Sequence, residues 1–210
     1  MITESDDMGI CYIVSAGEMF GKISALNSDD LLIAADAGYM HLQKSGVEPH
    51  ILLGDFDSMD APENRDVIVH PVMKDDTDTM LAIKLGFEKG YTQFVIYGAL
   101  GGERTDHTVA NLQSLAYIAE RGGKGTLVGN GEDFTVIRDS SITIEAAGKR
   151  IFSVFAYGGN AYGVTIRGSL FDVENAELTP FFPLGVSNKC KEDKVDIIVE
   201  KGCLLIVYSK

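Results

Sequence analysis

The sequence predicts an α/β fold: an N-terminal, mostly parallel α/β sheet domain followed by a C-terminal antiparallel β-sandwich domain. Two observations predict this class. In the first half, short apolar runs alternate with helix-like segments, which is typical of a parallel sheet covered on both faces. After Gly129 the chain offers only short strand-like runs broken by Gly, Asn or Asp, which is typical of a sandwich. We expect the domains to be residues 1–125 and 126–210, with the boundary in the glycine-rich stretch 122–131.

The elements of the first domain follow from apolar patterns. The expected strands are residues 10–16, 31–35, 51–53, 67–69 and 93–97. Two helical stripes lie among them. The first consists of Met80, Leu81, Ile83, Leu85 and Phe87, and the second of Val109, Leu112, Ala116 and Ala119. In the second domain, the expected strands are residues 134–138, 141–145, 151–157, 163–167, 195–200 and 204–208.

The composition limits the classes of partner. The chain has 210 residues and a net charge of −13, with no run rich in Lys or Arg. Nucleic acids and anionic membranes are therefore poor partners, because phosphate backbones are bound mainly by clustered cations. An acidic protein can still bind ATP if metal ions and a few local cations offset the charge of the nucleotide.

The cysteines and the N-terminus indicate a compartment. The three cysteines are scattered, which disfavours a disulfide framework or a zinc site. The polar, acidic N-terminus is unlike a signal peptide, and no apolar run is long enough to span a membrane. A cytoplasmic location is the simplest expectation.

Asp55 and Asp57 follow the expected strand 51–53 in the segment Gly-Asp-Phe-Asp-Ser. Alternate residues of an extended segment point the same way, so the two carboxylates can face one side together. Paired carboxylates are suited to Mg²⁺, and parallel sheets place their ligands at the carboxyl ends of their strands. The alternative is a solvated turn with two incidental acids.

A second acidic group, Asp75, Asp76 and Asp78, precedes the helix expected to begin near Thr79. Asp75 could be the N-cap with Asp78 as the acid three residues later, as in a capping box. Three acids exceed what one cap needs, so a metal or substrate ligand can coexist with the cap. Lys74 could pair with a phosphate or with its acidic neighbours.

A glycine-rich loop, residues 98–107, follows the strand 93–97. Gly101 and Gly102 let backbone N–H groups approach an anion, and the next helix would offer its N-terminus. Arg104 supplies a planar donor suited to phosphate. Asp106 could cap the helix, contact metal, or do both, while His107 reads more simply as a structural histidine.

No P-loop, dinucleotide-binding GxGxxG, GxSxG or HExxH motif is present. Phosphoryl transfer needs mostly positioning and charge neutralisation, which carboxylates holding Mg²⁺ and an arginine would supply.

These blocks, in this order and spacing, resemble the thiamine pyrophosphokinase family across nearly the whole chain. The matching blocks are residues 54–58, 74–78 and 101–111, with Ala-Asp-Ala-Gly at 35–38 and Gly-Val-Ser-Asn at 185–188. The resemblance implies a nucleotide-binding catalytic domain, a thiamine-binding β-sandwich and a homodimer. It also implies the transfer of the diphosphoryl group of ATP to the hydroxyl of thiamine, which yields thiamine diphosphate and AMP.

The resemblance also implies roles for residues. The implied catalytic residues are Asp55, Asp57, Asp75, Asp78, Arg104 and Asp106. Among them, Asp55, Asp57 and Asp78 would hold Mg²⁺. The implied contacts with the co-substrate ATP come from Asp36, Gly38, Lys74, Thr77, Gly101, Gly102 and His107. Ser187 and Asn188 would bind the aminopyrimidine of thiamine across the dimer interface; taken without the family, this pair reads as a plain turn.

Two departures from the family pattern stand out. Glu103 separates Gly102 from Arg104, where the pattern has arginine directly after the glycines. The chain has no Trp, so Phe181, Phe182 or a tyrosine would have to stack on the thiazolium. The competing functions are another Mg²⁺-dependent phosphotransferase or phosphohydrolase, and a nucleotide-binding sensor without catalysis.

Overall fold

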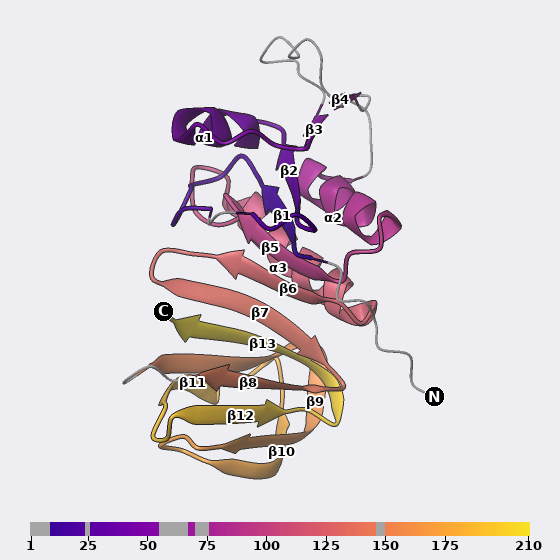
Figure 1. The fold of residues 1–210 in the computed structure, drawn as a ribbon. Helices are drawn as coiled ribbons and strands as arrows, with labels where there is room; N and C mark the ends of the chain where they lie inside the picture. The colour runs from indigo at the N-terminus through magenta and orange to yellow at the C-terminus, as the bar shows by residue number, and fades with distance from the viewer. Residues whose placement is uncertain (1–8, 24–25, 55–66, 70–75, 146–149) are drawn as a thin grey trace. The chain divides into compact units, whose positions relative to one another are not determined.

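The computed structural model describes residues 9–23, 26–54, 67–69, 76–145 and 150–210, and it confirms the mixed α/β class (Figure 1). The chain divides into two compact units. The first comprises residues 1–114 and 127–129, and the second comprises residues 115–126 and 130–210.

The first unit is built on a parallel sheet. Its strands are β1 (Cys11–Val14), β2 (Leu31–Ala35), β3 (Ile51–Gly54), β4 (Val67–Val69) and β5 (Gln93–Tyr97). They lie in the order β4-β3-β2-β1-β5, and each neighbouring pair is parallel. Strand β1 lies between β2 and β5. Strands β2, β3 and β4 follow it in sequence on one side, and the next strand, β5, lies on its other side. The order therefore reverses beside β1, which is the point where open parallel sheets bind ligands.

Two described helices, α1 (Gly38–Ser45) and α2 (Asp78–Glu88), pack against strands of this sheet, and a third, α3 (Thr105–Glu120), begins in this unit and ends in the second. Helix α1 was not expected, because its eight residues carry only a short apolar stripe and it begins with glycine. It ends at Gly46, whose φ of 67° is the left-handed conformation that glycine adopts most readily at a helix C-terminus.

The buried faces of α2 and α3 differ from the expected stripes. On α2 the buried residues are Thr79, Ala82, Ile83 and Gly86. On α3 they are Asn111, Ser114, Leu115 and Ile118, whereas Val109 is 53% exposed. The expected stripes were therefore right in part: Ile83 is fully buried and most other members are half-buried, but the most buried face of each helix also includes small or polar residues. A Cβ on Gly86, for example, would lie 2.5 Å from the Phe94 ring.

The second unit is antiparallel. Strand β6 (Lys124–Val128) falls at the division between the units and precedes seven further strands. They are β7 (Glu132–Arg138), β8 (Ser141–Glu145), β9 (Ile151–Arg167), β10 (Val173–Leu178), β11 (Gly185–Lys189), β12 (Lys194–Ile198) and β13 (Lys201–Ser209). The first part of β9 pairs with β13 and β11, and its last part pairs with β12 and β10. Phe152, Val164, Val195 and Leu204 belong to one apolar core between these strands.

Strands β10 and β11 were not expected from the sequence. Both lie against β9 with shifts in register, and most of their side chains are not buried. An exposed, bulged edge strand lacks the regular apolar alternation by which a strand is recognised. None of the described helices is long and apolar enough to cross a membrane.

Candidate nucleotide site in the first unit

A cavity of about 480 Å³ opens beside the carboxyl ends of the parallel strands. Its lining comes from segments that follow β1, β2 and β5 and from the starts of α2 and α3. The lining residues are Ser15, Ala16, Gly17, Glu18, Ala35, Asp36, Thr77, Asp78, Thr79, Gly98, Ala99, Gly101, Gly102, Glu103, Arg104, His107 and Asn111. The structure therefore gathers the expected residues Asp36, Thr77, Asp78 and the glycine-rich loop around one space.

The segment after β1 forms one wall of the cavity. The Ser15 amide donates to the Tyr97 carbonyl over 2.8 Å, and the Gly17 amide donates to the Gly98 carbonyl over 2.7 Å. The backbones are so close that a Cβ on Gly98 would lie 2.2 Å from the Ser15 carbonyl oxygen. The His41 ring nitrogen Nε2 lies 2.8 Å from the Gly17 carbonyl oxygen. The sequence reasoning missed this wall, since its contacts come from distant parts of the chain.

Asp36 follows β2 and lines the cavity in an unusual backbone conformation. Its φ is 53°, which non-glycine residues rarely adopt, although Asp and Asn tolerate it best. The Asp36 amide donates to the Leu53 carbonyl over 2.7 Å, and a Cβ on Gly54 would lie 3.3 Å from the Asp36 Cα. A backbone held in a sparsely populated conformation is common at functional sites.

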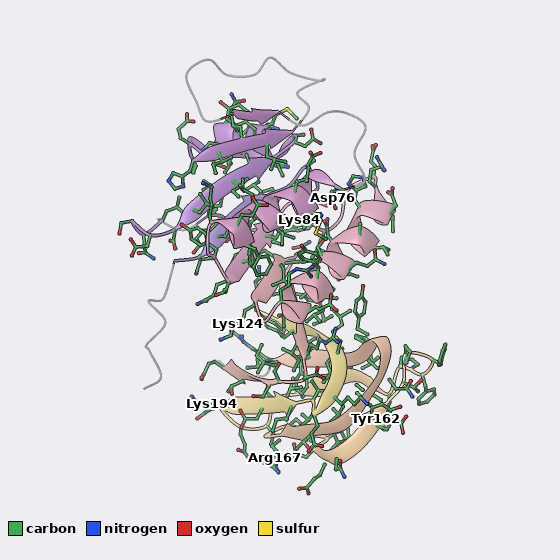
Figure 2. All side chains as sticks on the ribbon, turned by 90° about the vertical axis from the view of Figure 1, so that its right-hand side faces the viewer. Asp76, Lys84, Lys124, Tyr162, Arg167 and Lys194 are labelled. Atoms are coloured by element: carbon green, nitrogen blue, oxygen red, sulfur yellow. The ribbon has the colours of Figure 1, made fainter. Side chains whose placement is uncertain are left out.

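The start of α2 corrects the expected cap. The N-cap is Thr77, whose hydroxyl accepts a hydrogen bond from the Met80 amide over 3.2 Å, so the expectation of Asp75 as the cap was wrong. Thr77 has the extended backbone that a cap needs, and the helix begins one residue later, at Asp78. Figure 2 labels Asp76 and Lys84, whose carboxylate and ammonium are 2.6 Å apart.

The glycine-rich loop lies against the start of α3. Gly101 and Gly102 have φ of 70° and 79°, so both positions favour glycine. The buried Asn111 side chain donates from Nδ2 to the Ala99 carbonyl over 2.8 Å, which ties the loop to α3. Asn111 belongs to a matched sequence block but was assigned no role there.

Arg104 and Asp106 form a bidentate pair. Arg104 donates from Nε and a terminal nitrogen to the two carboxylate oxygens, over 3.0 Å and 2.6 Å. These hydrogen bonds lower the pKa of Asp106 to about 2, and they raise the pKa of Arg104. Both side chains are about two-thirds exposed. Arg104 lines the cavity despite the preceding Glu103, while Asp106 is bonded to Arg104.

The charges around the cavity are mostly negative. Glu18, Asp36, Asp78 and Glu103 line it, against a single arginine, Arg104, among the lining residues. A phosphate-bearing ligand would be repelled by such a lining unless cations lay between. Carboxylates are the type of ligand that Mg²⁺ takes together with phosphate oxygens.

Several expected site residues lie outside the part of the chain that the structure describes: Asp55, Asp57, Lys74 and Asp75. Within the described part, no group of three His, Cys, Asp or Glu side chains is arranged to hold a metal. Of the expected Mg²⁺ ligands, Asp78 alone is described.

Gly38 and His107 were both expected to contact ATP, but only His107 lines the cavity. His107 lines the cavity from the first turn of α3. Gly38 is buried at the start of α1, and a Cβ there would lie 1.9 Å from the Val14 carbonyl oxygen. The need for glycine at position 38 is therefore explained by close packing of α1 on β1.

In the second unit, Ser187 and Asn188 lie on the bulged strand β11. Ser187 is exposed and has a φ of 60°. Asn188 is 7% exposed, and its side chain is used within the protein. Its Nδ2 donates to the Ser169 hydroxyl and the Phe171 carbonyl, and its Oδ1 accepts from the Phe171 and Lys189 amides.

Beside β11 is a second cavity of about 300 Å³, lined by residues 154–156 and 178–185. Several apolar side chains there face solvent. Phe181 is 90% exposed, Phe182 is 63% exposed and Leu184 is 62% exposed. Neighbouring large apolar side chains in solvent commonly mark a binding surface.

Sequence models of two domains match the chain. Residues 23–125 match "Thiamin pyrophosphokinase, catalytic domain", and residues 140–204 match "Thiamin pyrophosphokinase, vitamin B1 binding domain". The thiamine pyrophosphokinase of Bacillus subtilis (strain 168) is 27% identical over 187 residues, covering 85% of this chain and 87% of that protein.

Solved structures share the fold. The crystal structure of thiamine pyrophosphokinase from Bacillus subtilis has a TM-score of 0.85 at 24% identity, covering 96% of this chain and 99% of the other. The corresponding protein from Geobacillus thermodenitrificans has a TM-score of 0.83 at 23% identity, covering 96% and 97%.

Proposed function

Because the chain belongs to the thiamine pyrophosphokinase family and so forms thiamine diphosphate from thiamine and ATP, we propose that ATP binds in the first-unit cavity. The observation that carries this is the glycine-rich loop beside the start of α3. Gly101 and Gly102 line the cavity, and both have the positive φ that glycine adopts most readily. The N-terminus of α3 adds partial positive charge, and the two together suit a phosphate chain.

The residues around the phosphates have distinct parts. Arg104 can donate to the outer phosphates from N–H groups beyond those used on Asp106, and Asp106 orients its guanidinium. Further ATP contacts in this proposal come from Asp36, Gly38, Lys74, Thr77 and His107. For Gly38 the part is indirect, since its packing on Val14 sets where α1 begins.

Mg²⁺ completes the proposed site, held by Asp78 with Asp55 and Asp57, and with Asp75 near the phosphates. The acidic lining supports a cation here, since the bare carboxylates would oppose ATP. Bound Mg²⁺ would neutralise charge that develops on the phosphate oxygens during transfer.

The thiamine hydroxyl would attack the β-phosphorus, so that the diphosphoryl group moves and AMP leaves. The chain then has to orient the hydroxyl and hold both outer phosphates, because a loose transition state needs little covalent help from the protein. Holding the outer phosphates is the part that we assign to Arg104 and the glycine-rich loop.

Thiamine recognition is assigned to the second unit, in a homodimer. Exposed Ser187 is the proposed contact with the aminopyrimidine, and Phe181 or Phe182 would stack on the thiazolium. Asn188 takes an indirect part, because its side-chain atoms bond to the 169–171 loop. Exposed Phe181, Phe182 and Leu184 support a partner subunit that covers them.

The proposed functional domains are residues 1–125 for nucleotide binding and catalysis and 126–210, a β-sandwich, for thiamine. The ends of the matched ranges, 125 and 140, support this division. A cytoplasmic location is also part of the proposal, supported by three free cysteines.

Phosphorus NMR of the protein with ATP, Mg²⁺ and thiamine tests the reaction. AMP and thiamine diphosphate should rise together in equal amounts. ADP with thiamine monophosphate would replace the proposal by an ordinary kinase. Inorganic phosphate with unchanged thiamine would replace it by a phosphohydrolase, and absence of turnover would favour a sensor.

A further inference from the structure

The hydroxyl groups of Ser15 and Thr79 lie 2.8 Å apart, within hydrogen-bonding distance, inside the first unit. Ser15 follows β1 and is 4% exposed, while Thr79 lies in the first turn of α2 and is 7% exposed. Both residues line the nucleotide cavity, although they are 64 positions apart in the chain. The sequence blocks that indicate ATP binding include neither residue.

Ser15 is a fixed point on the sheet. Its amide is bonded to the Tyr97 carbonyl, and the backbone of Gly98 lies against its carbonyl. A Cβ on Gly38 would also lie 3.1 Å from the Ser15 amide nitrogen. Close-packed backbone on both sides therefore fixes the position of the Ser15 backbone, from which the hydroxyl reaches Thr79.

Helix α2 is held differently along its length. Toward its C-terminal end, Gly86 packs closely on Phe94 and Cys11, so steric contact sets the position of the helix. In its first turn, the Ser15–Thr79 hydrogen bond joins the helix to the segment after β1. Thr79 directly follows Asp78, the proposed Mg²⁺ ligand, and lies two residues after the cap Thr77.

We propose that the Ser15–Thr79 hydroxyl pair positions the first turn of α2 so that Asp78 can receive the metal ion that accompanies ATP. Ser15 and Thr79 are positioning residues, acting through Asp78, and this inference rests on the metal role in the proposed function. Removing one buried hydroxyl leaves its partner unsatisfied and releases the turn from the sheet. The nucleotide site would remain, but its metal-linked affinity would fall.

Calorimetric titration with α,β-methylene-ATP, in which the bond to be cleaved is replaced, tests this without turnover. The quantity is the ratio of Kd values measured without and with Mg²⁺. In Thr79→Val, which keeps the side-chain shape, this ratio should fall by about five- to tenfold, while the Mg²⁺-free Kd stays within about twofold. The Thr79→Ser variant keeps the hydroxyl and should therefore keep the wild-type ratio.

Two further variants strengthen the test. Ser15→Ala should match Thr79→Val, and the double variant should be no worse than either single one, because both remove the same hydrogen bond. Thr135→Val is the matched control. Its buried hydroxyl donates to the Gly125 carbonyl over 2.7 Å in the second unit, so its loss should lower Tm and leave the ratio unchanged.

The Asp78→Asn variant distinguishes the positioning role of the Ser15–Thr79 pair from the proposed metal role of Asp78. If it lowers the ratio while Thr79→Val leaves it at the wild-type value, the positioning role is wrong and the metal role stands. If Asp78→Asn itself leaves the ratio unchanged, the metal role of Asp78 in the proposed function fails. A Thr79→Val variant that loses Tm but keeps the ratio would show a purely structural hydrogen bond.

Discussion

Arg104 carries the positive charge of the cavity lining while bonded to an acid two residues away. The pair with Asp106 fixes the guanidinium plane and leaves other N–H groups for a ligand. Asp36 shows a second residue-scale constraint, since its left-handed backbone brings an acid to the same cavity.

The Arg104–Asp106 pair predicts a pH dependence. In the folded state the pKa of Asp106 is about 2, below the ordinary value of 3.8. The ionised pair therefore stabilises the folded state above pH 3.8, and this stabilisation is lost as the pH falls through about 2. In Arg104→Gln, the pKa of Asp106 should rise toward 3.8, as measured by NMR titration of the carboxyl carbon. Lys194→Gln, which breaks the exposed pair with Glu145, is the control that should leave Asp106 unchanged. An Asp106 titration that is identical with and without Arg104 would contradict the pairing.

Gly38→Ala should destabilise the protein strongly. The added methyl group would lie 1.9 Å from the Val14 carbonyl oxygen, and backbone on both sides has to shift to admit it. We expect a loss of about 2–4 kcal/mol in the free energy of unfolding, measured by urea denaturation. Gly159→Ala is the matched control, since that position has open space and no positive φ, and it should change stability by less than about 1 kcal/mol. Equal losses in both variants would refute the packing argument.

At the scale of elements, the cavity depends on how helix starts are tied to loops. Thr77 caps α2, and Asn111 reaches from α3 to the glycine-rich loop. In each case a polar side chain satisfies a backbone group close to the proposed phosphate site.

Asn111→Ala should affect both stability and ATP binding. The substitution leaves the Ala99 carbonyl without the Asn111 donor, which should lower the free energy of unfolding by about 1–3 kcal/mol. It also releases the loop that carries Gly101 and Gly102 from α3. Steady-state kinetics should show the KM for ATP rising about tenfold, with a smaller change for thiamine. Ser114→Ala, also on α3, removes a hydroxyl that donates to the Ala110 carbonyl away from the cavity lining, and should leave both KM values unchanged. Equal rises for ATP and thiamine in Asn111→Ala would argue against a specific role for the loop.

The sequence predicted elements best where apolar runs are continuous. Strands β2, β4 and β5 have the expected limits, because each is a short continuous run of mostly apolar residues in a parallel sheet. The face of α3 was misjudged because polar Asn111 and Ser114 are buried by hydrogen bonds to backbone, which periodicity in apolar residues cannot detect.

The same reasoning explains which site residues were found. Asp36, Thr77, Asp78, Gly101, Gly102 and Arg104 were expected and line one cavity, since each belongs to a compact local motif. Ser15 and Thr79 gave no local signal, because each acquires its partner only when β1 and α2 come together. Asn188 looked like a ligand contact by position, yet its burial depends on a loop almost 20 residues earlier in the chain.

At the scale of the whole molecule, the exposed apolar side chains of the second unit support the proposed homodimer. Phe181, Phe182 and Leu184 lie within one short segment before β11. Such a group commonly marks an interaction surface, and two-fold dimers are the commonest soluble oligomers.

Substituting Phe181 and Phe182 together by serine should therefore shift the protein from dimer to monomer. Sedimentation velocity at several concentrations measures this. Activity should fall as the dimer is lost, because thiamine is proposed to bind across the interface. Val109→Ser, which changes an exposed apolar residue on α3 in the first unit, should leave the association state unchanged. A wild-type protein that remains monomeric at assay concentration with full activity would overturn the dimer proposal.

The path of the chain between the two units has a consequence for modularity. The chain passes from one unit to the other after residues 114, 126 and 129. The first of these crossings falls inside α3. Val128, between the last two, belongs to the apolar core of the first unit. A recombination event with a single breakpoint near residue 125 would transplant neither unit whole. We therefore expect misfolding in hybrid enzymes that join halves of two distant relatives at this point. A hybrid should fold only if residues 115–129 and the residues that they pack against come from the same relative.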